Sequence, residues 1–216
     1  MTAIATPATP TATLGRDRGR RLLALAGGIG AGVAGFWLML ANPISAAAAG
    51  DDVTAMLATR ATLLQGMALL AVFASAALIP AAIHLGSAAG GAAGKTIAAA
   101  GAATAVLLVA YIGSFAAGAM TATMLLDTPG AGVGEASLVI ANVAELARYA
   151  PSLALTMAAV AARDRLGRAA WIPAAVLTAL LIFPITTWLA AIIVPAWLGI
   201  AAATAEVNPN TAQTKG

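Results

Sequence analysis

Long apolar runs separated by short charged segments are the main pattern of this sequence. Five such runs cover residues 22–41, 61–83, 97–126, 136–162 and 169–203. A helix needs about 20 apolar residues to cross the hydrocarbon core of a bilayer, which is about 30 Å thick. The pattern therefore predicts an all-α fold, a polytopic integral membrane helix bundle with about five transmembrane helices.

Two of the runs are longer than one span needs. The run at 97–126 would form a helix of about 45 Å, which suffices for one tilted span and is too short for two. A hairpin at Pro184 would divide the run at 169–203 into two arms of roughly 15 residues, each too short to cross. The sequence therefore favours a single kinked helix there. In that helix Trp171 and Trp197 would lie about 39 Å apart, near the two interfaces where tryptophan is favoured.

The composition supports a membrane location. Hydrophobic residues make up 61% of the chain and charged residues 9%, whereas a soluble domain carries about 25% charged residues. The chain has no cysteine, which excludes disulfides and thiolate metal sites. Its net charge of +3 comes from scattered basic residues. Nucleic-acid binding needs a concentrated basic face, so the expected partner is the lipid bilayer rather than nucleic acid.

The basic residues also predict which end of the bundle faces the cytoplasm. With the N-terminus inside, eight basic side chains fall in cytoplasmic segments, and only Arg60 and Lys215 fall in outer ones. Such an excess obeys the positive-inside rule. The chain is then expected to have a disordered basic cytoplasmic tail at 1–21, a transmembrane bundle at 22–203 and an external tail at 204–216, in the cell membrane. The eight cytoplasmic residues are Arg16, Arg18, Arg20, Arg21, Lys95, Arg163, Arg165 and Arg168.

The first apolar run permits a second interpretation. Its arginine-rich start and the small residues at 45–49 also fit a secretory signal peptide. Cleavage would remove residues 1–49 and leave the other four helices in the same orientation. The run is long for a signal peptide and rich in glycine, which favours a retained helix.

Small residues recur at a spacing that favours close helix packing. Gly28 and Gly32 in the first run, and Gly113 and Ala117 in the third, are four residues apart. This spacing lets helix backbones approach one another. Packing within one bundle explains it best, and contact with a second copy or another membrane protein is the alternative.

Two charged residues inside the fourth run form the main candidate site. Glu145 and Arg148 are three apart, so they share a helix face and can pair. Each charge at mid-bilayer disfavours insertion by roughly 2.5–3.5 kcal/mol, so this face must turn toward other helices. Asn142 and Arg60 would extend the polar site. It is either an ion or substrate site or a structural pair, and the sequence favours the pair because the two charges cancel.

Other motifs give little support to catalysis. Residues 89–96 fit a relaxed phosphate-binding loop, and 127–130 resemble a magnesium-binding turn, but a phosphate loop must follow a strand and here it follows an apolar run. His84 is the single histidine, which excludes a bis-histidine haem within one chain and a His-Glu-x-x-His zinc site. Ser114 has no base within expected reach.

The sequence therefore predicts a membrane protein without a cofactor or enzymatic activity. Its expected role is that of an accessory or scaffold protein, which contacts other membrane proteins or a second copy through small-residue helix faces. A small transporter or ion-coupled permease component that uses Glu145 and Arg148 is the alternative.

Overall fold

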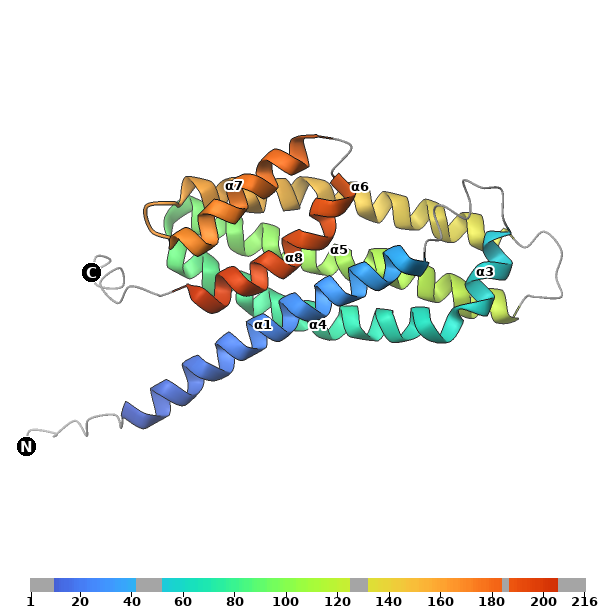
Figure 1. The fold of residues 1–216 in the computed structure, drawn as a ribbon, viewed down its shortest axis with the longest axis horizontal. Helices are drawn as coiled ribbons and strands as arrows, with labels where there is room; N and C mark the ends of the chain where they lie inside the picture. The colour runs from blue at the N-terminus through green and yellow to red at the C-terminus, as the bar shows by residue number, and fades with distance from the viewer. Residues whose placement is uncertain (1–9, 42–51, 125–131, 184–186, 206–216) are drawn as a thin grey trace, which may run out of the picture.

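The computed structural model describes residues 10–41, 52–124, 132–183 and 187–205, and these residues are helical apart from short turns (Figure 1). Four segments are long and apolar enough to span a membrane: Asp17–Leu38, Ala61–Ala89, Gly91–Met124 and Val133–Ala161. This agrees with the predicted all-α membrane bundle. The helices are α1 (Pro10–Ala41), α3 (Val53–Thr59), α4 (Ala61–Ala89), α5 (Gly91–Met124), α6 (Val133–Ala161), α7 (Arg168–Ile182) and α8 (Thr187–Thr204).

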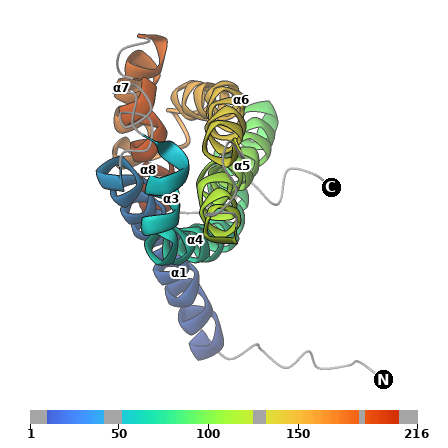
Figure 2. The same cartoon turned by 90° about the vertical axis from the view of Figure 1, so that its right-hand side faces the viewer.

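The bundle has two layers, which are visible along its long axis (Figure 2). Helices α4, α5 and α6 form one layer, with α5 packed along both neighbours. Helices α1, α8 and α7 form the other, in which α8 lies between α1 and α7. The layers meet where α1 packs on α4 and α7 packs on α6.

A single residue separates α4 from α5. Gly90 has a φ of 65°, a positive value that glycine adopts without the steric cost other residues incur. The Arg165 side chain closes this turn from the α6–α7 connection, because its Nη1 donates to the carbonyl of Ala89 at 3.1 Å. A cation there is favourable, since the last carbonyls of a helix carry partial negative charge.

Close backbone contact joins α1 to α8. A Cβ atom on Gly199 would lie 2.4 Å from the carbonyl oxygen of Ala24, and one on Gly28 would lie 3.0 Å from the Cα of Gly199. Only glycine fits at such a crossing. The predicted small-residue face of the first run therefore packs within the chain. A Cβ on Gly113 would meet nothing within 4 Å, so the small face of the third run is not used in this way.

The last apolar run does not form the single kinked helix that its length suggested. It forms α7 and α8, which are antiparallel: the indole Nε1 of Trp197 in late α8 donates to the carbonyl of Ala170 in early α7, at 2.9 Å. Trp171 and Trp197 therefore lie at one end of the bundle rather than at two opposite interfaces, and Trp197 is buried. The helices end on either side of residues 183–186, which include Pro184, a residue that lacks the N–H needed to continue a helix.

Both ends of the described chain lie at the same end of the bundle (Figure 1). Gly199 near the end of α8 packs on Ala24 in the first half of α1. This differs from the expected external C-terminus, although the tail itself, at 206–216, lies outside the described residues. The short arms α7 and α8 are stable because each packs on other helices, a condition that the length of a run does not reveal.

Two boundaries at the N-terminal side also differ from expectation. Helix α1 begins at Pro10, so residues 10–21 are helical rather than disordered. The short helix α3 was not predicted. Asp52 caps it by accepting a hydrogen bond from the Ala55 N–H at 3.0 Å, as aspartates at the N-cap of a helix commonly do. The hydroxyl oxygen of Thr54 accepts from the Gly134 N–H at 3.1 Å and so fixes α3 against the start of α6.

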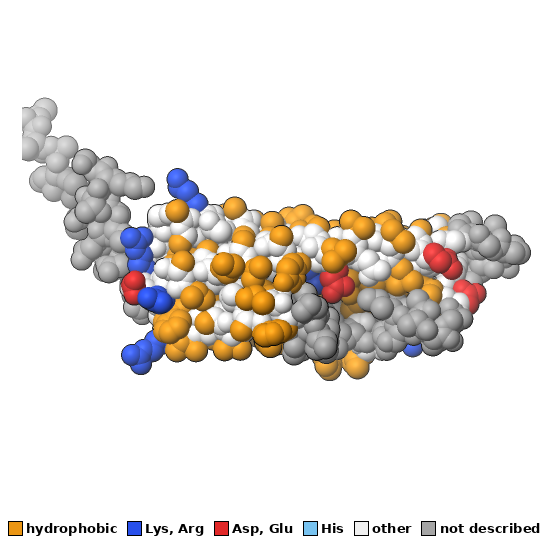
Figure 3. All heavy atoms as spheres, turned by 90° about the horizontal axis from the view of Figure 1, so that it is seen from above, with side chains coloured by type: hydrophobic (Ala, Val, Ile, Leu, Met, Phe, Trp, Pro, Cys, Tyr) orange, Lys and Arg blue, Asp and Glu red, His pale blue; other side chains and the backbone are white. Residues whose placement is uncertain are grey.

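Charges gather at the two ends of the bundle, and the surface between them is largely apolar (Figure 3). One end holds the start of α1 and the α4–α5 and α6–α7 turns, and the other holds α3 and the start of α6 with Asp52, Glu135 and Arg60. Exposed apolar side chains cover the long helices in between, and these are the side chains that lipid would solvate. We call the first end the basic end, because it carries exposed basic residues, namely Arg18, Arg20, Arg21, Lys95, Arg163, Arg165 and Arg168.

Candidate functional site

Arg148 lies inside the bundle at the middle of α6. Its side chain is 2% exposed. The interval of 3.6 residues per turn places it on the same face as the buried residues Ala141, Ala144 and Ser152. That face packs on α5. The sequence pattern alone thus explains why the charge points inward: the opposite face carries the large apolar residues that face lipid.

The partner of Arg148 is an aromatic ring on α5. The guanidinium carbon lies 5.1 Å from the centre of the Tyr111 ring, within the range of a cation–π contact. The ring is itself held by an edge-to-face contact with Phe115, with centroids 5.7 Å apart. Phe115 is fully buried. The Arg148 charge therefore lies against an aromatic ring that is itself packed on a buried ring.

One donor of Arg148 has no acceptor. Its Nε is buried and makes no hydrogen bond in the described part of the chain. An unsatisfied buried donor costs about 1–3 kcal/mol, and more when it is charged. The cation–π contact offsets part of this cost, since such contacts contribute about 2 kcal/mol when desolvated.

The expected polar site is only partly assembled. Glu145 is half-buried on the same helix and forms no salt bridge with Arg148, although the spacing allows one. The two side chains do not meet, because Arg148 turns toward Tyr111 while Glu145 lies at the edge of the buried face. Asn142 is exposed one turn earlier, and Arg60 lies between α3 and α4 at the end of the bundle that holds α3 and the start of α6. The structure thus joins Arg148 to Tyr111, not to Arg60.

Hydroxyl groups continue the polar line beyond Arg148. The hydroxyl oxygens of Thr104 and Ser152 are 3.4 Å apart across the α5–α6 interface. Ser75 of α4 donates to the carbonyl of Ala105 at 2.7 Å. Tyr149 donates from its hydroxyl to the carbonyl of Leu181 near the end of α7. Buried polar groups at the centre of the bundle therefore connect three helices of one layer and one helix of the other.

The other motifs occupy ordinary places in the fold. Residues 90–96 follow helix α4 rather than a strand and belong to the turn and first turns of α5, so the context of a phosphate loop is missing. Residues 127–130 lie outside the described residues. The Ser114 hydroxyl donates to the carbonyl of Tyr111 at 2.7 Å. His84 lines a pocket at the basic end.

Tyr111 is the residue of the candidate site that the sequence did not suggest. In the sequence Tyr111 is only a polar aromatic residue within an apolar run. The alignment of α5 against α6 is what brings it to Arg148. Comparison of the chain with protein-family models, with curated proteins and with solved structures finds no match.

Proposed function

We propose that this is a multi-pass protein of the cell membrane that acts without catalysis, as an accessory subunit or scaffold for other membrane proteins. The observation that supports this role is the position of Arg148. Its side chain is buried between α5 and α6 and lies against the Tyr111 ring, where it contributes to the packing of these two helices. Neither residue lines the pocket at the basic end or the groove along α5 and α6.

The charge distribution supports an orientation with the basic end in the cytoplasm. Exposed arginines and Lys95 gather there, as the positive-inside rule requires. The Tyr149–Leu181 hydrogen bond places the end of α7 at the middle of α6, which is about 20 Å from the basic end. We therefore propose four full spans and a hairpin, α7–α8, that enters the membrane from the cytoplasmic side, in place of the five spans expected. The packing of α1 on α4 and α8 favours a retained first helix.

A second candidate role is that of an ion-coupled permease component. The Nε of Arg148 lacks an acceptor among the described residues, and Glu145 forms no salt bridge with Arg148. Both are ionisable groups within a membrane span, where such groups are often functional. This role requires that Glu145 exchange a proton or contact a substrate.

Proton flux separates the two roles. Wild type and Glu145→Gln are reconstituted into vesicles that contain a pH-sensitive dye, and a potassium diffusion potential is imposed. The scaffold role predicts that neither protein raises proton flux above that of empty vesicles. Flux in the wild type that is lost in a normally folded Glu145→Gln protein would establish the permease instead.

A positive test of the scaffold role uses photocrosslinking in cell membranes. A photoreactive amino acid replaces one lipid-facing residue at a time on three helices: Phe73, Met124 and Leu146, which are 72%, 78% and 75% exposed. We expect at least one position to form a discrete adduct with another membrane protein. Ala159, which is fully buried, serves as the control position. Lipid adducts alone at all three exposed positions would contradict a scaffold role.

A further inference from the structure

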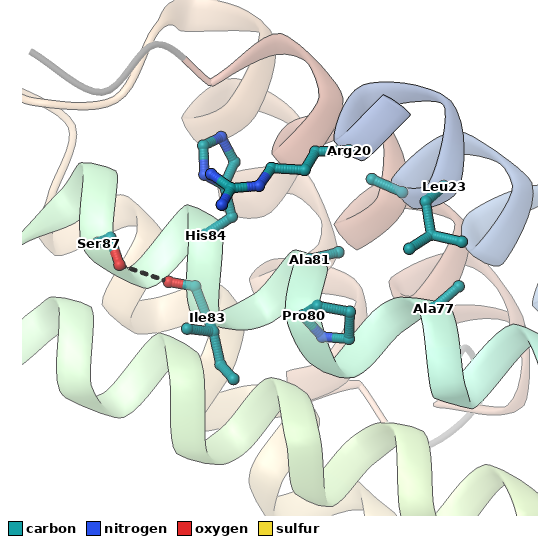
Figure 4. A pocket seen from close by; sticks show the side chains of 9 residues that line it. Arg20, Leu23, Ala77, Pro80, Ala81, Ile83, His84 and Ser87 are labelled. Atoms are coloured by element: carbon teal, nitrogen blue, oxygen red, sulfur yellow. Dashed lines mark hydrogen bonds between the residues drawn. The ribbon is translucent and has the colours of Figure 1, made fainter. Parts of the chain in front are cut away.

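A pocket at the basic end combines cationic side chains with an apolar wall. It has a volume of about 350 Å³ and lies between α1 and α4 (Figure 4). Arg20 extends from α1 toward His84 on α4, and Ser87 lies one turn beyond His84. The apolar part of the lining comes from both helices and consists of Leu23, Ala24, Ala77, Pro80, Ala81 and Ile83.

The polar part of this pocket is suited to an anion. No acidic side chain of the described residues lines it. The nearest acid along α1, Asp17, lies one turn before Arg20 and is not part of the lining. Among the described residues neither Arg20 nor His84 forms a salt bridge or a hydrogen bond. The Ser87 hydroxyl already donates to the carbonyl of Ile83 at 2.8 Å. The free N–H donors of the pocket therefore come from Arg20 and His84.

The place of the pocket in the membrane narrows the choice of anion. Arg20 stands at the boundary between the basic segment and the apolar part of α1, where phospholipid headgroups lie. Leu23 and Ile83 are half-exposed on the apolar side, so they can lie along an acyl chain. Basic pockets between helices on the cytoplasmic side are typical sites for anionic headgroups, and guanidinium groups bind phosphate through charge-assisted hydrogen bonds.

We propose that this pocket binds the phosphate of an anionic phospholipid, with Arg20 and His84 as donors to its oxygens and with the acyl chains over Leu23 and Ile83. The lipid would link α1 to α4 at the cytoplasmic surface. This inference stands apart from the scaffold or permease role, because it involves neither Glu145 nor Arg148.

Native mass spectrometry of the full chain in a neutral detergent tests the proposal. Phosphatidylglycerol is titrated against wild type, Arg20→Gln, His84→Gln and the matched control Arg21→Gln. Arg21 is an exposed arginine that does not line the pocket. Its loss changes the net charge by the same amount as the loss of Arg20. Phosphatidylcholine and inorganic phosphate are titrated in parallel. Melting temperatures in lipid-free detergent establish that all four proteins are folded.

We expect phosphatidylglycerol to bind more tightly than phosphatidylcholine. Its affinity should fall at least about tenfold in Arg20→Gln and His84→Gln, since a charged hydrogen bond contributes at least that factor, and should stay within about twofold in Arg21→Gln. Equal losses in Arg20→Gln and Arg21→Gln would overturn the proposal, because general attraction to the basic end would then explain binding. Equal binding of both lipids would also overturn it. Displacement of the lipid by equimolar inorganic phosphate would identify a free-ion site instead.

Discussion

Arg148 and Tyr111 face each other across the α5–α6 interface, with the guanidinium carbon 5.1 Å from the ring centre. The contact allows a charge to remain inside a bundle that is otherwise small and apolar. A water-filled cavity would also stabilise the charge, but it would separate the helices. The ring instead stabilises the charge by filling space, and α5 and α6 stay in contact.

The Tyr111 ring should therefore stabilise the protein by more than the packing of its volume alone. We expect Tyr111→Leu to destabilise the protein by about 2–3 kcal/mol, since it removes a desolvated cation–π contact and an aromatic pair with Phe115. Thermal unfolding in detergent measures this effect as a lower melting temperature. Tyr111→Phe is the matched control: it keeps the ring and both contacts, and should melt close to the wild type. Equal losses in the two variants would assign the effect to the hydroxyl group rather than to the ring.

The α1–α8 crossing should tolerate no side chain. A Cβ on Gly199 would lie 2.4 Å from the Ala24 carbonyl oxygen, so Gly199→Ala forces the backbones apart. Overpacking of this kind costs about 1–3 kcal/mol, which should lower the melting temperature. Gly32→Ala is the control on the same helix pair, because its Cβ would lie at an ordinary 3.5 Å from the Ala196 side chain. It should be neutral or slightly stabilising, since alanine favours helix.

Arg165 should stabilise the α4–α5 turn. Its Nη1 donates to the Ala89 carbonyl at the end of α4, and a cation at a helix C-terminus contributes about 0.3–1 kcal/mol. We expect Arg165→Ala to lower the melting temperature more than Arg163→Ala does. Arg163 is exposed, and its salt bridge joins only the next residue, Asp164, at 3.9 Å. A larger loss in Arg163→Ala would show that this turn does not depend on Arg165.

Apolar runs located the long helices but not their ends. The second run was expected at 61–83, and α4 begins at Ala61 but continues to Ala89. Hydropathy marks the part of a helix that contacts lipid, whereas the helix ends where the backbone turns. Here that point is Gly90, which has a positive φ, as does Gly91. The sequence shows a glycine-rich segment at this place, but not which glycine makes the turn.

Contacts between distant residues could not be predicted from apolar runs. The sequence identified Arg148 as an intramembrane charge, because one helix is enough to recognise it. Its partner Tyr111, like the pair of Arg20 and His84, depends on how two helices are aligned, and one sequence carries no information on that alignment. The length criterion failed for the run at 169–203 for a related reason: α7 and α8 are supported by α6 and α1, not by lipid alone.

The hairpin makes a prediction about topology that the absence of cysteine makes easy to test. Single cysteines are placed at Thr204, at Arg163 and at Thr59, and intact cells are treated with a thiol reagent that does not cross the membrane. All three positions are exposed. Thr204 ends α8, which lies beside early α7 and early α1, so we expect it to be protected like Arg163, while Thr59 at the opposite end is labelled. A single kinked helix over 169–203 would place Thr204 outside, and labelling of Thr204 together with Thr59 would restore that arrangement. Labelling after permeabilisation shows that each cysteine is reactive, so protection in intact cells can be assigned to the membrane.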